Sequence, residues 1–232
     1  MLDSALQSLK EGAWREIAEI DRALADGRID DDGWHSAIAR LIKPAYLAAT
    51  NPYAQAGHSG NAESWEASRG FIAEAIYRSG SFLDVGCASG ILMESVHGWG
   101  RRKNLAIDPH GLEIIPELAR LAMQRLPQWA NRIHVGNIRN WSHPFMRFDY
   151  VLIRPEYAPV PRRAALVGHV LQYVVKPGGR LIVFVGNEES EERTAEARIT
   201  SDGIPVHGRV EVPHPKDRRL QRRLFWIDNE YA

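Results

Sequence analysis

A run of small residues follows a short apolar segment in the first half of the chain. Residues 82–85 (Phe-Leu-Asp-Val) have the character of a buried strand, and Gly86-Cys87-Ala88-Ser89-Gly90 follows at once. Small side chains let a backbone approach a ligand closely, and a helix starting here would point free N–H groups at that ligand. The Gly-x-Ala-x-Gly spacing differs from the Gly-x-Gly-x-x-Gly of nicotinamide-binding proteins. We therefore expect this turn to hold a ligand other than a nicotinamide dinucleotide.

An acidic residue stands where the next strand is expected to end. Leu105-Ala106-Ile107 predicts a short strand that ends at Asp108. Ligands of open α/β sheets bind at the carboxyl ends of the strands, and a carboxylate there can accept hydrogen bonds from both hydroxyls of a ribose. We expect this role for Asp108, with a helix cap or a turn as its structural alternative.

Several ordered motifs together resemble those of the class I S-adenosylmethionine-dependent methyltransferases. The resemblance covers residues 64–185 and, more loosely, 186–228. The matching segments are the Gly-rich turn at 83–90, the ribose acid at 106–109, the adenine turn at 135–138, the fourth strand at 148–152 and the turn before the fifth strand at 174–182. Ala88 departs from the family, because it replaces the usual middle glycine, which a negative φ would permit. The resemblance implies S-adenosyl-L-methionine as the cofactor.

The resemblance also implies cofactor contacts at individual residues. Asn137 matches the residue that accepts a hydrogen bond from the adenine amino group, and Arg69 matches an arginine that holds the methionyl carboxylate in several relatives. A surface position is an equal alternative for Arg69. The cofactor-binding residues expected in this way are Arg69, Asp84, Gly86, Cys87, Ala88, Gly90, Asp108, Pro109, Gly136, Asn137, Ile138 and Arg154.

The segment after the fourth predicted strand bears on the methyl acceptor. It reads Arg154-Pro155-Glu156-Tyr157, so the Asn/Asp-Pro-Pro-Tyr box of methyltransferases acting on adenine or glutamine is absent. We therefore expect a small-molecule acceptor. Two residues are candidate catalytic bases: His58, by its near-neutral pKa, and Glu156, if burial raises its pKa. The alternatives are an exposed loop histidine and a helix-capping glutamate, with catalysis by positioning alone.

The remaining side chains with reactive chemistry are the single cysteine and the histidines. No histidine is placed by the sequence to activate Cys87, so we expect a small residue packed beside the cofactor rather than a nucleophile. The nine histidines show no close metal-ligand spacing, and we expect no metal site.

The elements that must position these residues alternate between helix and strand. Residues 1–48 predict two helices broken at 26–30, residues 51–62 a loop, and 63–78 a helix. Further helices are predicted at 91–97, 116–125, 162–174 and 189–200, and strands at 82–85, 105–107, 133–135, 148–153, 180–185, 206–212 and 222–227. This order predicts an α/β fold, a Rossmann-like, seven-stranded and mostly parallel sheet with an antiparallel C-terminal hairpin. Residues 1–62 would form a helical cap and lid loop, and 63–232 the cofactor-binding domain.

Composition limits the remaining possibilities. The 232 residues are 44% hydrophobic and carry 29 basic and 29 acidic side chains, which indicates a globular protein and argues mildly against a nucleic-acid partner. No apolar run approaches a membrane span, the N-terminus lacks a signal-peptide pattern, and one cysteine excludes a disulfide framework. We expect a cytoplasmic, bacterial protein, either a monomer or a homodimer. An RNA methyltransferase using the arginines at 218–223, and a non-catalytic cofactor-binding protein, stay open.

Overall fold

The computed structural model describes residues 15–189, 194–214 and 220–230, and the chain divides into two compact units, 1–49 and 50–232. In the first unit, residues 15–25 are helical and α2 spans Asp31–Ala48. Asp30 caps α2 by accepting a hydrogen bond from the Gly33 N–H at 2.8 Å. The Trp34 indole donates to Asp21 at 2.7 Å, which ties the two helices together. The predicted pair of helices is confirmed, whereas its role as a cap stays a prediction.

The second unit is built on a seven-stranded sheet. The strand order is β3-β2-β1-β4-β5-β7-β6, with β7 antiparallel to both of its neighbours and the first five strands parallel. The strands are β1 Gly80–Val85, β2 Ile107–Glu113, β3 Ile133–Val135, β4 Phe148–Ile153, β5 Val175–Glu189, β6 Gly208–Pro213 and β7 Leu220–Asp228. The predicted fold class is confirmed. The strand order reverses between β1 and β4, which is where open α/β sheets bind their ligands.

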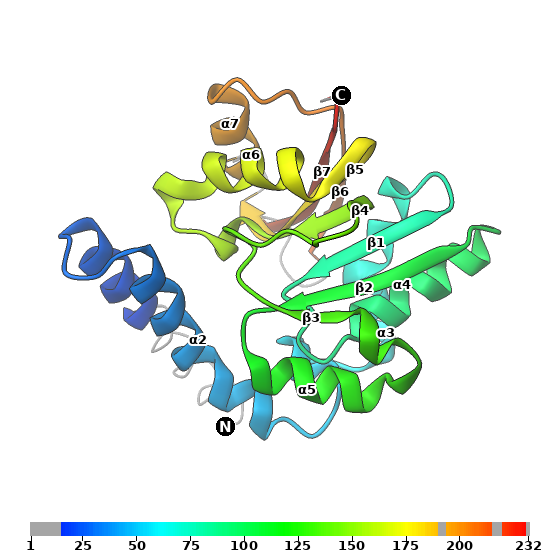
Figure 1. Cartoon of the computed structure of the whole chain (residues 1–232), viewed down its shortest axis with the longest axis horizontal. Helices are drawn as coiled ribbons and strands as arrows, with labels where there is room; N and C mark the ends of the chain where they lie inside the picture. The colour runs from blue at the N-terminus through cyan, green and yellow to red at the C-terminus, as the bar shows by residue number, and fades with distance from the viewer. Residues whose placement is uncertain (1–14, 190–193, 215–219, 231–232) are drawn as a thin grey trace. The chain divides into compact units, whose positions relative to one another are not determined.

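Helices cover both faces of this sheet (Figure 1). They are α3 Ala62–Arg69, α4 Ile91–Arg102, α5 Pro116–Arg125, α6 Arg163–Tyr173 and α7 Thr194–Ser201. Side chains alternate between the faces along each strand. Leu83 and Val151 pack on the side of α6 and α7, whereas Phe82, Tyr150 and Phe184 pack on the side of α3 and α4. Among the described residues, no helix combines the length and the apolar character needed to cross a bilayer.

Strand β2 differs from its prediction, because it begins at Ile107 and ends at Glu113 rather than at Asp108. Pro109 and Gly111, which lie beyond the predicted end, are residue types that weaken or end strands. Only residues 111–113 pair with β3, so the missing N–H of Pro109 falls in the part of β2 that has β1 as its sole neighbour. Gly111 allows close packing, because a Cβ there would lie 2.7 Å from Cys87 Sγ. The strand therefore continues through both residues.

Other element boundaries also differ from their predictions. The helix predicted at 63–78 ends at Arg69 and continues as the 3₁₀ helix η2, Gly70–Ala75. The turn expected before the fifth strand, within 174–182, is an irregularity within β5, where Phe148 pairs with Val175 and Tyr150 with Arg180. The start of the helix predicted at 189–200 falls partly on residues 190–193, outside the described residues, and α7 begins at Thr194.

Candidate functional site

The Gly-rich turn lies at the carboxyl end of β1 and leads into α4. Gly86 and Gly90 have φ values of +68° and +72°, which L side chains rarely adopt. Space is also restricted, since a Cβ on Gly86 would overlap the Tyr157 hydroxyl and one on Gly90 would lie 2.6 Å from Leu126 Cδ1. Both glycines are thus required by the backbone and by their neighbours.

Ala88 adopts a left-handed conformation, with φ of +47°. The expectation that a negative φ accommodates this alanine is therefore wrong. The conformation is held by a hydrogen bond, because the Ala88 N–H donates to Glu113 Oε2 at 2.9 Å. A left-handed L residue costs roughly 1–2 kcal/mol, so the turn stores strain beside the proposed site.

We expect Ala88→Gly to leave the free energy of unfolding within about 0.5 kcal/mol of the wild-type value. Relief of the strain offsets the loss of one buried methyl group, about 0.8 kcal/mol, and the extra freedom of the unfolded chain. Ala119→Gly, a buried helical control, should cost about 2 kcal/mol, because nothing offsets these losses. Urea unfolding of both variants measures the difference, and equal losses would contradict the strain.

Glu113 is the acidic residue at the carboxyl end of β2. Its side chain is 4% exposed, and its carboxylate accepts hydrogen bonds from the backbone N–H groups of Ala88 and Ile115, both at 2.9 Å. Burial raises its pKa, although these backbone hydrogen bonds act in the opposite direction. Glu113 therefore lies beside the Gly-rich turn, where the sequence analysis placed Asp108.

Asp108 lies at the opposite end of the same strand, in register with Ser81 at the start of β1. Its half-exposed carboxylate is ion-paired with Arg132 and shares a hydrogen bond with His110 Nε2 at 3.2 Å. The placement of Asp108 and Pro109 at the ligand edge is therefore wrong. Glu113 could have been found from the sequence, because it stands three residues before a helix that begins with Pro116, as Asp84 stands shortly before the helix after β1.

Asp84 is the other buried acid at this edge. It is 3% exposed, and none of the described residues donates a hydrogen bond to its carboxylate. Burial raises its pKa well above the usual range, and the nearby charge of Glu113 adds to this. A buried carboxylate without donors beside a backbone cradle is suited to a ligand that brings a cationic or hydrogen-bond donating group.

The turn after β3 contains the residues expected to hold adenine. The side chain of Asn137 accepts a hydrogen bond from the Arg139 N–H at 3.0 Å, so its carboxamide oxygen already stabilises the turn. A Cβ on Gly136 would lie 2.6 Å from Trp141 Cδ1, and Ile138 is buried in the core. The adenine contacts of this turn stay a prediction.

Three arginines, which we call the arginine cluster, come from separate elements: Arg69, Arg154 and Arg222. The guanidinium carbons of Arg69 and Arg154 lie 4.5 and 5.6 Å from the centroid of the Phe184 ring. Alternate residues of a strand point to the same face of a sheet. Arg222 therefore lies on the same side as Leu224, which packs in the core with Phe184. Burial and the charges of Arg154 and Arg222 lower the pKa of Arg69 to about 10.

The two candidate bases have different surroundings. Burial alone would raise the pKa of Glu156, but the charge and hydrogen bonds of Arg154, 3.2 Å away, bring it below the usual range. The condition set for Glu156 as a base is therefore not met. His58 Nε2 shares a hydrogen bond with Ser64 Oγ at 2.9 Å. Burial, followed by the charges of Arg69 and Arg222, lowers the pKa of His58, which favours the neutral imidazole.

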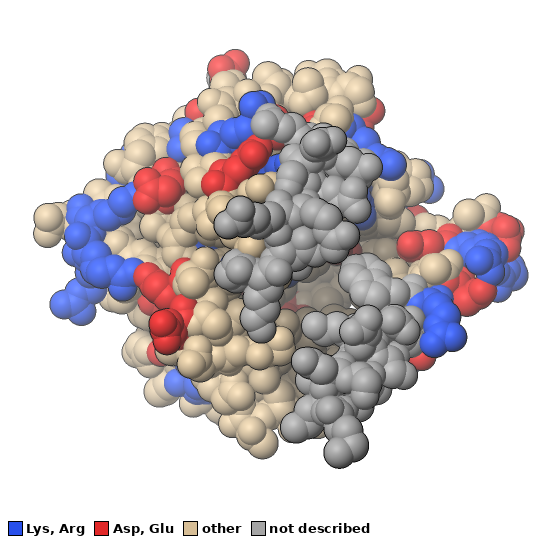
Figure 2. All heavy atoms as spheres, turned by 180° about the vertical axis from the view of Figure 1, so that it is seen from behind, with Lys and Arg blue, Asp and Glu red and all other residues tan. Residues whose placement is uncertain are grey.

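Cys87 is a buried thiol, and the described histidines form no metal site. Burial raises the pKa of the Cys87 thiol well above its usual range, and its side chain packs with Met93 in a small core. Within residues 15–189, 194–214 and 220–230, no group of three or more His, Cys, Asp or Glu side chains could hold a metal ion. On the face drawn in Figure 2, basic and acidic side chains are both scattered among larger uncharged areas.

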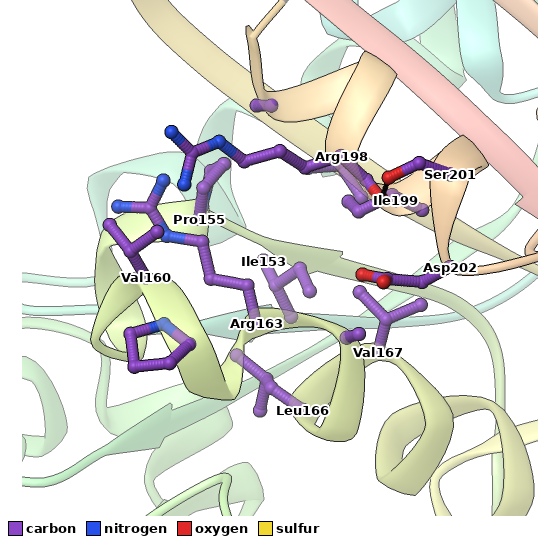
Figure 3. Close-up of a pocket in the computed structure, with 14 residues that line it drawn as sticks. Ile153, Pro155, Val160, Arg163, Leu166, Val167, Arg198, Ile199, Ser201 and Asp202 are labelled. Carbon is purple, nitrogen blue, oxygen red and sulfur yellow. Dashed lines mark hydrogen bonds between the residues drawn. The ribbon is translucent and has the colours of Figure 1, made fainter.

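A cavity of about 420 Å³ lies on the other side of the sheet, between α6 and α7 (Figure 3). Ile153, Leu166 and Val167 give it an apolar lining, and the long side chains of Arg163 and Arg198 extend in the same direction. It is large enough for a small molecule. It lies on the face opposite Phe184, so we treat it as separate from the site formed by Asp84, Glu113 and the arginine cluster.

Comparison with solved structures identifies the fold. The N-methyltransferase NodS from Bradyrhizobium japonicum WM9 superposes with a TM-score of 0.54 at 14% identity, over 73% of this chain and 97% of that one. A Pyrococcus horikoshii OT3 protein gives 0.59 at 15% identity, over 79% and 98%. The geranyl diphosphate C-methyltransferase of Streptomyces coelicolor A3(2), solved with S-adenosyl-L-homocysteine, gives 0.51 at 15%, over 72% and 79%. No family model and no curated protein matches the chain. The chain has the fold of the class I S-adenosylmethionine-dependent methyltransferases.

Proposed function

We propose that this protein transfers a methyl group from S-adenosyl-L-methionine to a small-molecule acceptor. The main support for this proposal is that two buried acids, Asp84 and Glu113, lie beside a Gly-rich turn in the methyltransferase fold. Both acids are buried at the carboxyl ends of adjacent strands, and the carboxylate of Asp84 accepts no hydrogen bond from the described residues. Such a site has donors and acceptors for a charged nucleoside ligand rather than for an apolar one.

Each part of the cofactor has a candidate partner in this chain. We assign the ribose hydroxyls to Glu113 in place of Asp108, the methionyl ammonium to Asp84 and the methionyl carboxylate to Arg69. A bidentate guanidinium contact suits a carboxylate. Arg69 stacks on Phe184 and has no acidic partner among the described residues. Gly86, Cys87, Ala88 and Gly90 would form the cradle, and the turn at 136–138 the adenine contact.

The chain's own contribution to the reaction would be mainly positioning. When bound, S-adenosyl-L-methionine supplies an activated methyl group on a positively charged sulfur. The protein must hold the acceptor atom in line and exclude water. Where the acceptor must lose a proton, we propose His58 as the base, because its lowered pKa keeps the imidazole neutral at physiological pH.

The proposed function is tested by binding and by transfer. We expect calorimetric titration to show S-adenosyl-L-homocysteine binding with a dissociation constant on the order of micromolar, and methyl transfer to members of a small-molecule pool but not to RNA. Failure to bind would contradict the proposal outright. Binding without transfer to either pool would identify a non-catalytic cofactor-binding protein, and transfer to RNA would identify the nucleic-acid alternative.

A further inference from the structure

The arginine cluster brings three guanidinium groups to one side of the sheet. Glu156 pairs with Arg154, whereas neither Arg69 nor Arg222 forms an ion pair with any residue the structure describes. Within the part of the chain that the structure describes, the Arg69 guanidinium donates to the carbonyl of Ser68, at 3.1 Å, and contacts the rings of Trp65 and Phe184. Charges withdrawn from water are costly unless an opposite charge compensates them. The arrangement is therefore suited to anions that arrive with ligands.

The proposed cofactor supplies only part of that compensation. It has a single carboxylate, which one guanidinium satisfies, and its sulfonium adds a further positive charge. With Arg69 assigned to the carboxylate, Arg154 and Arg222 are on the same side of the sheet, at the carboxyl ends of β4 and β5. We place the methyl acceptor in the same region, because ligands of open α/β sheets bind outside the carboxyl ends of the strands.

We propose that the methyl acceptor carries an anionic oxygen group, a carboxylate or a phosphate, bound by Arg154 and Arg222. This inference rests on the proposed function. A planar guanidinium presents paired donors that match both groups. Arg69 and Arg154 pack against Phe184, and all three arginines are half-buried, unlike the exposed basic stripe that nucleic acids require. A small anion therefore fits better than an RNA backbone.

The test compares matched anionic and neutral probes on protein saturated with S-adenosyl-L-homocysteine. In this complex the carboxylate of the ligand is expected to be bound by Arg69. Benzoate, phenyl phosphate and neutral benzamide are titrated while the fluorescence of Trp65 is followed, because its ring lies 5.4 Å from the Arg69 guanidinium. We expect at least one anion to bind and Arg222→Gln to weaken it about 10-fold or more, the worth of one charge-assisted contact. Arg120→Gln, an exposed control outside the cluster, should leave its affinity unchanged.

The outcomes distinguish failure of the anion-binding inference from failure of the proposed methyltransferase function. Tighter binding of benzoate assigns a carboxylate, and tighter binding of phenyl phosphate assigns a phosphate. Equal binding of benzamide, or an Arg222→Gln variant with unchanged anion affinity, overturns the inference while the binding of S-adenosyl-L-homocysteine stands. Binding of single-stranded RNA that Arg222→Gln abolishes would also overturn it. If the wild-type protein did not bind S-adenosyl-L-homocysteine, the proposed function itself would be contradicted.

Discussion

Replacing Glu113 by glutamine is expected to weaken the binding of S-adenosyl-L-homocysteine by about 10- to 100-fold. Glutamine keeps the size of the side chain but loses the charge and one of the two acceptor oxygens. A hydrogen bond to a charged group is worth about 1.5–3 kcal/mol, and each 1.4 kcal/mol changes a dissociation constant tenfold. Calorimetric titration measures the change, and thermal unfolding shows whether the loss of one backbone hydrogen bond, to Ala88 or Ile115, has destabilised the fold.

Asp108→Asn is the matched control for this change. Asp108 lies on the same strand, but its carboxylate is half-exposed and paired with Arg132 at the opposite edge of the sheet. We expect its affinity to match the wild type and its stability to fall by less than about 1 kcal/mol, as for exposed ion pairs. If Asp108→Asn lost affinity while Glu113→Gln kept it, the ribose would bind where the sequence alone placed it.

The error at β2 has an identifiable physical cause. Periodicity and breaker residues predicted most elements to within a few residues, including the helix that begins at Pro116. At β2, however, Pro109 and Gly111 have tertiary roles that local pattern cannot show. The proline falls where a neighbouring strand is missing, and the glycine makes room for Cys87. Extending the strand by five residues moved the ligand edge from Asp108 to Glu113.

The arginine cluster shows a second limit of reading the sequence. Arg69 was singled out by its likeness to a family position and Arg154 as part of the segment after the fourth strand, but Arg222 was seen only as part of a basic segment near the C-terminus. The three residues are far apart in the chain and meet because β7 inserts beside β5 and runs antiparallel to it. The pairing of β5 and β7 also sets which side of the sheet Arg222 occupies, and this depends on register rather than composition.

The largest contrast between stability and function is expected at Asp84. Asp84→Asn should weaken cofactor binding by about 10-fold or more, because it removes the charge that we assign to the methionyl ammonium. The same change should raise the free energy of unfolding by roughly 1–3 kcal/mol at neutral pH, since it removes a buried carboxylate that receives no hydrogen bond from the described residues. Binding and urea unfolding are measured on the same preparation.

The effect of pH on the stability difference follows from the direction of the Asp84 pKa shift. Burial holds the pKa of Asp84 above that of the unfolded chain, so the wild type loses stability as pH rises from the unfolded pKa towards the folded one. The stability advantage of Asp84→Asn over the wild type should therefore grow between acidic and neutral pH.

Asp149 is the opposite case, because hydrogen bonds from Lys176 and Ser81 outweigh burial and lower its pKa. Asp149→Asn should accordingly destabilise the protein at neutral pH and lose this effect in acid. If both variants were destabilised in parallel at all pH values, Asp84 would have a partner in the folded protein, and its assignment to the cofactor would fail.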